Sequence, residues 1–323
     1  MRLRTISALM LGVFVVAGHA QAQRVIELGH TLSTTSHYGV GAQAFKAHLE
    51  AVSGGAMTIR EHAAGSVGGE RDMIEGLQIG TLDLVITSTG PLGNFVPDTY
   101  VLDLPFLFSD YDHARSVLDG EIGQQLLDQM RDHDLIGLAW SENGFRHMTN
   151  SRREVHQPSD VSGLSIRTME NQVHMDAFRE LGARPTPMAF PELFTALQQG
   201  TVDAQENPIT VIVATNFWEV QGHLSLTGHV YSPAIVLGSP ILWDSLSAEE
   251  QGWFLEAAAA SAQATRNEVS RLERDGIALL RENGMTVIED VDNAPFQALV
   301  EPVYAAFMAR HGGEMLERIQ ATR

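Results

Sequence analysis

The sequence predicts an α/β protein with two domains. Its 323 residues are about twice the ~150 residues of a typical domain. Short apolar strands alternate with helices, which is the pattern of βαβ units and a parallel sheet. One helical pattern without proline runs from residue 248 to about residue 282, and at roughly 1.5 Å per residue it is long enough to pass from one domain to the other. Because no low-complexity linker occurs, we expect crossing strands and helices to join the domains.

The first α/β series covers residues 25–90. Apolar residues recur with period two in its strands and with helical spacing in its helices. The predicted strands are 25–29, 57–60 and 82–86, and the predicted helices are 39–52 and 70–79. Prolines at positions 91, 97 and 105 predict a loop over 91–110.

The second series starts near 136–139. It continues through a strand at 164–168 and helices near 171–181 and 191–199. Glycines stand at the ends of these elements, where they are typical of turns and helix stops. These glycines are Gly163, Gly182 and Gly200.

Composition and charge exclude several classes of function. The chain has 40 acidic and 21 basic residues, a formal charge of −19, which argues against partners such as nucleic acid or anionic lipid. Lys46 is the only lysine, and its neighbours Phe45 and Ala47 do not form a P-loop or an obvious Schiff-base site. The absence of cysteine excludes thiol nucleophiles, disulfides and thiolate metal sites.

The N-terminus predicts export. Arg2 and Arg4 precede an apolar run at 6–17 and the small-x-small motif Ala20-Gln21-Ala22, which together are typical of a secretory signal peptide over residues 1–22. Cleavage after Ala22 leaves a mature chain with a charge of about −21. The alternative is an uncleaved N-terminal anchor.

The usual catalytic motifs are missing from the sequence. There is no H-E-x-x-H, and Gly65-Ser66-Val67-Gly68 lacks the spacing of a nucleophile elbow. The motif Gly39-Val40-Gly41-Ala42-Gln43-Ala44 resembles a dinucleotide fingerprint with Glu61 downstream. Residues 31–38 separate it from the preceding strand, however, so we expect these glycines to begin a helix and not to hold a pyrophosphate.

Two arginines near strand ends are the most informative polar residues. Arg167 ends the predicted strand 164–168, and Arg146 follows Asn143-Gly144-Phe145. Ligands of open α/β sheets bind at the carboxyl ends of strands, and the guanidinium fork matches a carboxylate. The alternative is that each arginine pairs with an Asp or Glu of the chain.

The sequence around Arg167 resembles a known family. Residues 182–208, which end in Gln205-Glu206-Asn207-Pro208, closely resemble the DctP-type solute-binding proteins of tripartite ATP-independent periplasmic (TRAP) transporters. So do 163–167, Gly68-Gly69-Glu70-Arg71 and 216–221, and the resemblance extends over essentially the whole mature chain.

The resemblance implies a periplasmic solute-binding protein fold. Such proteins have two α/β lobes around a central cleft and a long helix that spans both. Projected onto this chain, lobe I is 23–144 plus 233–272, and lobe II is 145–232 plus 273–323. The helical pattern at 248–282 fits this plan independently.

The resemblance also implies function and location. The expected protein is a periplasmic receptor that binds a small organic acid and delivers it to the membrane permease subunits of an ion-gradient-driven TRAP transporter. It performs no chemistry, and no cofactor or metal is expected. Two alternatives remain: an exported enzyme acting on an organic acid, with or without a nicotinamide cofactor, and a receptor that serves a sensor protein and not a permease.

The site residues are carried over from the family motifs. Arg167 is expected to pair with the ligand carboxylate, Arg146 to be a second arginine, and Asn207 to be the amide beside the carboxylate. The remaining expected contacts are Phe190 as an apolar wall, Glu70, Thr87 and Ser88 as partners of ligand hydroxyls, and His37 in the loop after the first strand. Such a set favours a hydroxylated or sugar acid. The alternatives are that Glu70 caps its helix, that Thr87 and Ser88 satisfy a turn, and that Phe190 is core.

Overall fold

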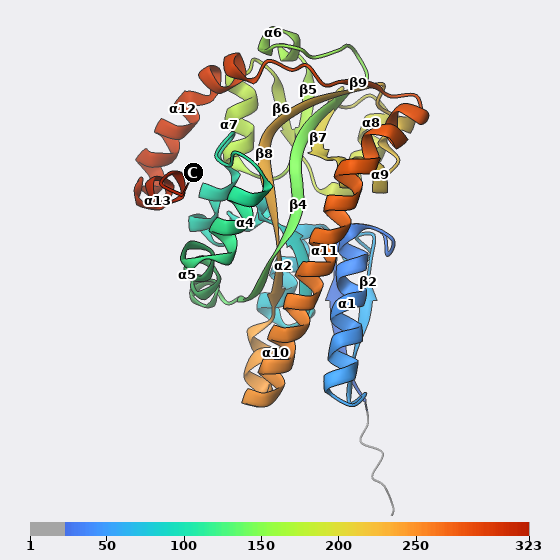
Figure 1. Ribbon diagram of the computed structural model, residues 1–323, viewed down its shortest axis with the longest axis vertical. Helices are drawn as coiled ribbons and strands as arrows, with labels where there is room; N and C mark the ends of the chain where they lie inside the picture. The colour runs from blue at the N-terminus through green and yellow to red at the C-terminus, as the bar shows by residue number, and fades with distance from the viewer. Residues whose placement is uncertain (1–22, 323) are drawn as a thin grey trace, which may run out of the picture.

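The computed structural model describes residues 23–322, so the predicted signal peptide lies outside the described residues. Within them the chain forms a nine-stranded mixed sheet covered by helices on both faces (Figure 1). The strand order is β2-β1-β3-β8-β4-β7-β5-β6, with β9 beside β8. The strands are β1 Arg24–Gly29, β2 Met57–His62, β3 Leu84–Ser88, β4 Ile136–Asn150, β5 Ser165–Thr168, β6 Arg184–Pro187, β7 Ala204–Pro208, β8 His223–Gly238 and β9 Thr286–Ile288.

The helices predicted from the sequence are present in the structure. Helices 70–79 and 248–282 have the predicted bounds, and the others differ by a few residues at their ends. The α-helices are α1 His37–Val52, α2 Glu70–Ile79, α3 Thr89–Leu92, α4 Tyr111–Asp119, α5 Glu121–Gln129, α6 Pro158–Val161, α7 Gln172–Glu180, α8 Phe190–Gln198, α9 Ile209–Ala214, α10 Pro240–Ser245, α11 Ala248–Glu282, α12 Asn293–His311 and α13 Glu314–Gln320. The 3₁₀ helices are η1 Pro97–Asp103, η2 Met130–His133 and η3 Phe217–Glu219.

None of the helices in residues 23–322 combines the length and hydrophobicity that crossing a membrane requires.

The expectation of a parallel sheet is correct at the two ends of the sheet and for the short β9 beside β8. Strand β1 pairs in parallel with β2 and β3, and β5 pairs in parallel with β6 and β7. The centre is antiparallel, because β8 pairs with β3 and β4, and β4 pairs with β7. The predicted alternation of helices and strands included the start of β4, near 136–139, but not β8, and both strands are far longer than the strands of a βαβ unit.

Strands β4 and β8 are shared by both ends of the sheet. The C-terminal part of β8 pairs with β3, whereas its N-terminal part pairs with β9; the C-terminal part of β4 pairs with β7. The β4–β8 ladder has register shifts at Gly137/Ala139, Glu142/Gly144 and Arg146/Met148, and such bulges bend a strand. Gly144 has φ +119°, which favours glycine. The crossing expected from the lack of a linker is therefore made by two bent strands.

The core lies on the two faces of the sheet. Along β3, Val85 belongs to the first of two apolar clusters and Leu84 and Ile86 belong to the second, as the period-two geometry of a strand requires. The first cluster lies under α4, α5, α7, α12 and α13, and the second lies under α1, α8, α9 and α11.

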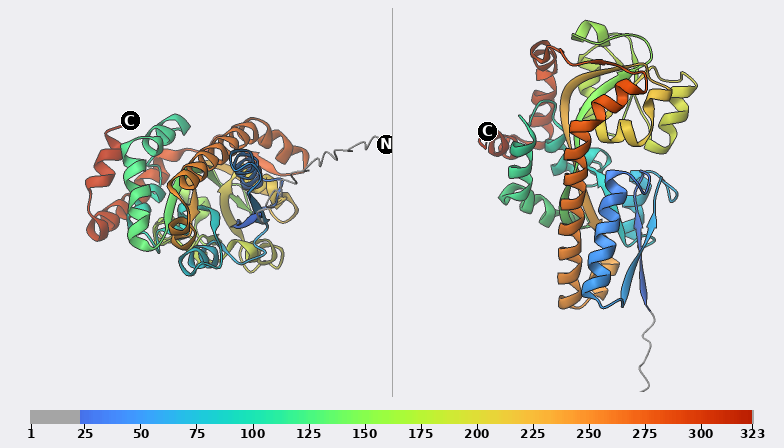
Figure 2. Two further views of the ribbon diagram at one scale, coloured as in Figure 1. Left: turned by 90° about the horizontal axis from the view of Figure 1, so that it is seen from below. Right: turned by 45° about the vertical axis from the view of Figure 1, so that its right-hand side comes forward.

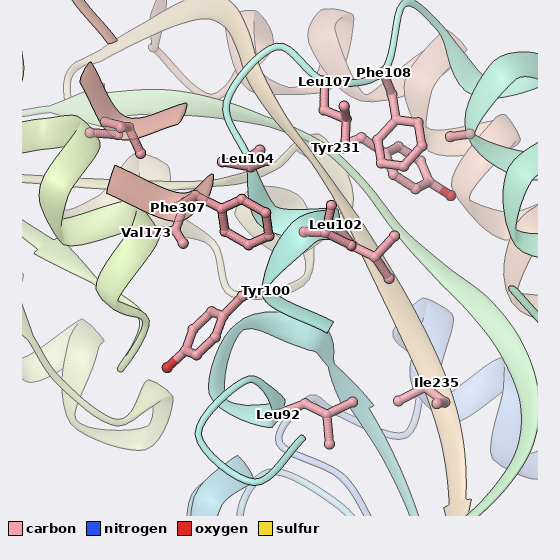
Figure 3. Packing of buried hydrophobic residues seen from close by; sticks show 14 of the residues in the cluster. Leu92, Tyr100, Leu102, Leu104, Leu107, Phe108, Val173, Tyr231, Ile235 and Phe307 are labelled. Carbon is pink, nitrogen blue, oxygen red and sulfur yellow. The ribbon is translucent and has the colours of Figure 1, made fainter. Parts of the chain in front are cut away.

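Residues 91–110 are not the predicted open loop. They include α3 and η1, whose Pro97 stands at the start of the helix, where proline is tolerated. Figure 3 shows Tyr100, Leu102 and Leu104 of this segment among the residues of the first cluster. Pro97 begins η1 and Pro91 lies in the first turn of α3, while the buried apolar side chains hold the segment in place.

Helix α11 passes along both ends of the sheet (Figures 1 and 2). It packs against α1, where a Cβ at Gly41 would lie 2.4 Å from Thr265 Oγ1. Gly39 and Gly41 lie inside α1, as predicted, and Gly41 allows the close approach of the two helices. The dinucleotide-like motif thus has a packing role in the structure.

Glu273 of α11 lies over the bent part of β4. A Cβ at Gly144 would lie 3.7 Å from Glu273 Oε1, which is buried without a hydrogen-bond partner. Burial raises the pKa of Glu273 to about 7; Tyr111 opposes the shift and the charge of Glu142 adds to it. The folded protein therefore holds a proton here that the unfolded chain releases at lower pH.

We predict that this proton makes stability fall as pH rises from about 4.5 to about 7, because the folded state binds more protons than the unfolded state in that window. Glu273→Gln cannot ionise, so its stability should not fall in this pH range. We expect the variant to be more stable than wild type by about 2–3 kcal/mol at pH 8 and to differ little from it at pH 4.5. Urea denaturation at both pH values measures this, with the exposed Glu282→Gln as control. An equal gain at both pH values contradicts the assignment.

Candidate ligand-binding cavity

A cavity lies between the two ends of the sheet, with about 270 Å³ of space that no atom fills, part of it open to solvent. Its wall combines charged, amide and hydroxyl groups with apolar side chains, as small-molecule sites do. It is lined by Thr31, Leu32, Tyr38, Glu70, Ser88, Asn143, Arg167, Met169, Phe190, Asn207 and Val211.

Strand ends and helix starts supply the polar lining. The parallel strands β3 and β5 end in this region, where ligands of open α/β sheets bind. Glu70 is the first residue of α2 and Phe190 the first of α8, so both side chains project from helix N-termini. The other polar lining residues come from the loop after β1 (Thr31), α1 (Tyr38), β3 (Ser88), β4 (Asn143), β5 (Arg167) and β7 (Asn207).

Arg167 is buried without a counter-ion. Its side chain is 1 % exposed, and both Nε and Nη2 donate to the carbonyl oxygen of Met188 at 2.9 and 2.7 Å. Nη1 is buried with no hydrogen-bond partner, and among the described residues no carboxylate forms an ion pair with this guanidinium. Burial lowers the pKa of Arg167 to about 10, which still leaves it charged at neutral pH.

Phe190 forms the wall beside this cation. The guanidinium carbon of Arg167 lies 5.9 Å from the centre of the Phe190 ring, a cation–π distance. Phe190 also packs edge-on against Phe217 of the second apolar cluster. The ring is thus both cavity wall and core, which unites the two alternatives that the sequence left open.

Arg146 has a carboxylate partner within the chain. Its Nε donates to Glu206 Oε2 at 2.5 Å and its Nη2 to Glu206 Oε1 at 2.9 Å, and both side chains are fully buried. Nη2 also donates to Asn207 Oδ1 at 3.1 Å. Burial alone would raise the pKa of Glu206, but Arg146 and His229 hold it well below its usual range. Arg146 therefore orients Asn207 from behind the cavity wall.

Glu70 accepts three hydrogen bonds on a single oxygen. Thr87 Oγ1, Ser88 N and Ser88 Oγ donate to Oε1 at 3.0, 2.8 and 2.8 Å. None of these bonds uses Oε2, and within residues 23–322 Glu70 has no cationic partner. Glu70 is the first residue of α2, but its carboxylate binds residues of β3 and does not cap the helix. The cap is formed by Gly69, whose backbone N donates to Asp72 Oδ2.

His37 lies behind the wall and holds Asn143. Its Nε2 lies 2.9 Å from Asn143 Oδ1, and burial lowers the pKa of His37 to about 4, so the ring is neutral at pH 7. The neutral ring donates through Nε2, because the amide oxygen can only accept. This bond fixes Asn143 with its Nδ2 group free to donate.

Tyr38 contributes a second unpaired donor. The residue is 2 % exposed, lines the cavity, and has no hydrogen-bond partner for its hydroxyl. Burial and then the charge of Glu70 raise the pKa of Tyr38 well above its usual value, so the hydroxyl stays protonated. Buried polar groups are normally hydrogen-bonded, and this one lacks an acceptor.

The structure brings most of the predicted site residues to one cavity. Arg167, Asn207, Phe190, Glu70 and Ser88 line it. The other three lie one layer behind the wall because each is engaged by a neighbour: Arg146 by Glu206, Thr87 by Glu70 and His37 by Asn143.

The sequence reasoning missed several lining residues. Tyr38 directly follows His37, and Asn143 stands three residues before Arg146, so both adjoin positions that were named. Tyr38 lines the cavity because α1 starts at His37, and Asn143 does so because β4 has a bulge at Glu142/Gly144. The spacing of apolar residues in the sequence predicts neither feature. Leu32, Met169 and Val211 carry no sequence signal that separates cavity wall from core.

No group of three or more His, Asp or Glu side chains within residues 23–322 is arranged to hold a metal ion.

Comparisons with known proteins agree with this geometry. The family model of bacterial extracellular solute-binding proteins, family 7 (DctP), matches residues 28–311. A solute-binding protein of Verminephrobacter eiseniae is 47 % identical over 304 residues, which are 94 % of this chain and 91 % of the relative.

Two solved structures share the architecture with a TM-score of 0.91. One is a TRAP periplasmic solute-binding protein from Polaromonas sp. JS666 bound to D-erythronate, 54 % identical and covering 93 % of this chain and 99 % of that one. The other is from Bordetella bronchiseptica with density interpreted as pantoate, 50 % identical and covering 93 % and 100 % of the two chains. The predicted two-lobe α/β fold is thereby confirmed.

Removal of the two arginines is expected to lower the stability of the ligand-free protein by very different amounts. Arg146→Ala leaves Glu206 buried without a cation and is predicted to lower the free energy of unfolding by about 3–5 kcal/mol. Arg167→Met removes a buried cation that has no counter-ion, and the loss is predicted to stay below about 1 kcal/mol. Urea denaturation measures both variants, and equal losses would show that the two cations do not differ in this way.

Proposed function

The chain belongs to the bacterial extracellular solute-binding proteins of family 7, the DctP type, and we propose that it is a periplasmic receptor for a small hydroxylated carboxylate. The receptor delivers this ligand unchanged to the permease subunits of an ion-gradient-driven TRAP transporter. Members of the family are transport receptors and not enzymes.

The observation that carries the proposal is the unpaired guanidinium of Arg167. A buried cation whose Nη1 lacks a partner is complementary to an anion placed in the cavity beside it. Arg146 is not available for this role, since Glu206 neutralises it. Asn207 and Asn143 add amide groups around the same volume.

The two similar structures support a short polyhydroxy acid. Their ligands, D-erythronate and pantoate, are both monocarboxylates with a four-carbon main chain and hydroxyls on carbons 2 and 4. The cavity of this chain offers the matching groups, a carboxylate partner in Arg167 and hydroxyl partners in Glu70, Ser88 and Tyr38.

We further propose that the lobes are 23–144 plus 233–272 and 145–232 plus 273–323. In support, the strand crossings at 144/145 and 232/233 fall at the irregular part of the β4–β8 ladder, where bulges allow bending. The cavity takes Tyr38, Glu70 and Ser88 from the first lobe and Arg167, Phe190 and Asn207 from the second. A ligand in contact with both sets favours the closed arrangement.

Arg167→Met is predicted to weaken the binding of D-erythronate by roughly 30-fold to several thousand-fold, because a buried charge pair with the carboxylate is lost. Arg167→Lys is expected to weaken it as well, since an ammonium lacks the planar fork. Titration calorimetry measures the affinities, with the exposed Arg179→Met as control. If Arg167→Met binds D-erythronate as tightly as wild type, Arg167 is not the partner of the ligand carboxylate.

Ligand is predicted to reduce the radius of gyration, because it holds the two lobes together. Small-angle scattering with and without saturating D-erythronate tests this, and Arg167→Met at the same ligand concentration serves as the control. Superimposable wild-type profiles would count against closure.

A further inference from the structure

The cavity holds two oppositely charged groups that do not pair with each other. Arg167 comes from β5 and Glu70 from α2, and no ion pair joins them or links either to another side chain of the described residues. Both are buried, with Glu70 8 % exposed. A ligand that fits between them must therefore present an anionic group to one side and no negative charge to the other.

The groups around Glu70 define what the uncharged end must be. Oε1 is saturated by Thr87 and Ser88, so Oε2 is the oxygen left to accept. The Tyr38 hydroxyl is buried, lines the same cavity and lacks an acceptor, and the charge of Glu70 acts on it. This corner thus offers one acceptor and one donor.

A ligand hydroxyl satisfies both groups. It donates its proton to Glu70 Oε2 and accepts from the Tyr38 hydroxyl through an oxygen lone pair. A ligand carboxylate also accepts from Tyr38, but it has no proton for Glu70 and places two anions together in a desolvated cavity. A methyl group leaves both polar groups without partners.

Resting on the proposed function, we propose that Glu70 and Tyr38 form a hydroxyl-specific subsite that makes the receptor select hydroxy monocarboxylates and reject dicarboxylates of the same chain length. Arg167 binds the carboxylate, and Glu70 and Tyr38 bind a hydroxyl at the other end of the ligand. Tyr38 is a ligand-binding residue in this arrangement, and Glu70 determines specificity by its charge.

The test compares 4-hydroxybutanoate with succinate, which differ only in whether the chain ends in a hydroxymethyl or a carboxylate group. Wild type is expected to bind 4-hydroxybutanoate at least tenfold more tightly than succinate in titration calorimetry. Glu70→Gln keeps an acceptor oxygen for Thr87 and Ser88 but removes the charge, and it is expected to narrow this ratio at least tenfold. Glu75→Gln, an exposed change on the same helix, is the control and leaves the ratio as in wild type.

Tyr38→Phe provides an independent readout. The ring is retained, and the affinity for 4-hydroxybutanoate is expected to fall about 3- to 10-fold, the effect of one uncharged hydrogen bond. Butanoate, which has no hydroxyl, is expected to bind this variant as it binds wild type. A merely structural role of Tyr38 would lower both affinities together.

The outcomes separate this inference from the proposed function. If wild type binds D-erythronate and 4-hydroxybutanoate but its preference over succinate survives Glu70→Gln, the subsite is overturned and the receptor function stands. Equal wild-type affinities for succinate and 4-hydroxybutanoate overturn the subsite as well. If wild type binds no hydroxy acid at all, both the function and the subsite fall.

Discussion

The guanidinium of Arg167 is the charge around which the cavity is organised. One carbonyl, that of Met188, orients it, and no carboxylate of the described chain neutralises it. The desolvation of this buried cation therefore stays uncompensated by any ion pair within the described chain. Arg146 differs, because Glu206 forms a buried ion pair with it and neutralises its charge within the protein. The two arginines that the sequence singled out thus differ: Arg146 is neutralised within the chain and Arg167 is not.

Much of this arrangement was accessible from the sequence. Helix α11 was predicted with its exact bounds because a regular apolar spacing without proline specifies a helix by itself. The cavity residues that sequence motifs supplied, Arg167 and Asn207 among them, do line the cavity. The sequence left open whether Arg146 pairs with an acidic residue of the chain, because Arg146 and Glu206 meet only when β4 and β7 are neighbours.

What the sequence did not reveal depends on long-range pairing. The antiparallel centre of the sheet joins residues far apart in the chain, so the helix–strand alternation carried no sign of it. Tyr38 and Asn143 enter the cavity for the same reason, through a helix start and a bulge that tertiary contacts position. The net charge of −19 likewise says little about the ligand, because the anion recognition that we propose rests on one buried cation.

The shared strands also set an order of events in folding. Residues 136–150 of β4 pair with residues 223–238 of β8, and β3 completes its own pairing only with the end of β8. Neither end of the sheet is therefore complete until about three quarters of the chain has been synthesised, and pairing of such high sequence separation is slow. The same topology that joins the two ends of the sheet through a pair of bent strands thus postpones the completed sheet to the last part of synthesis.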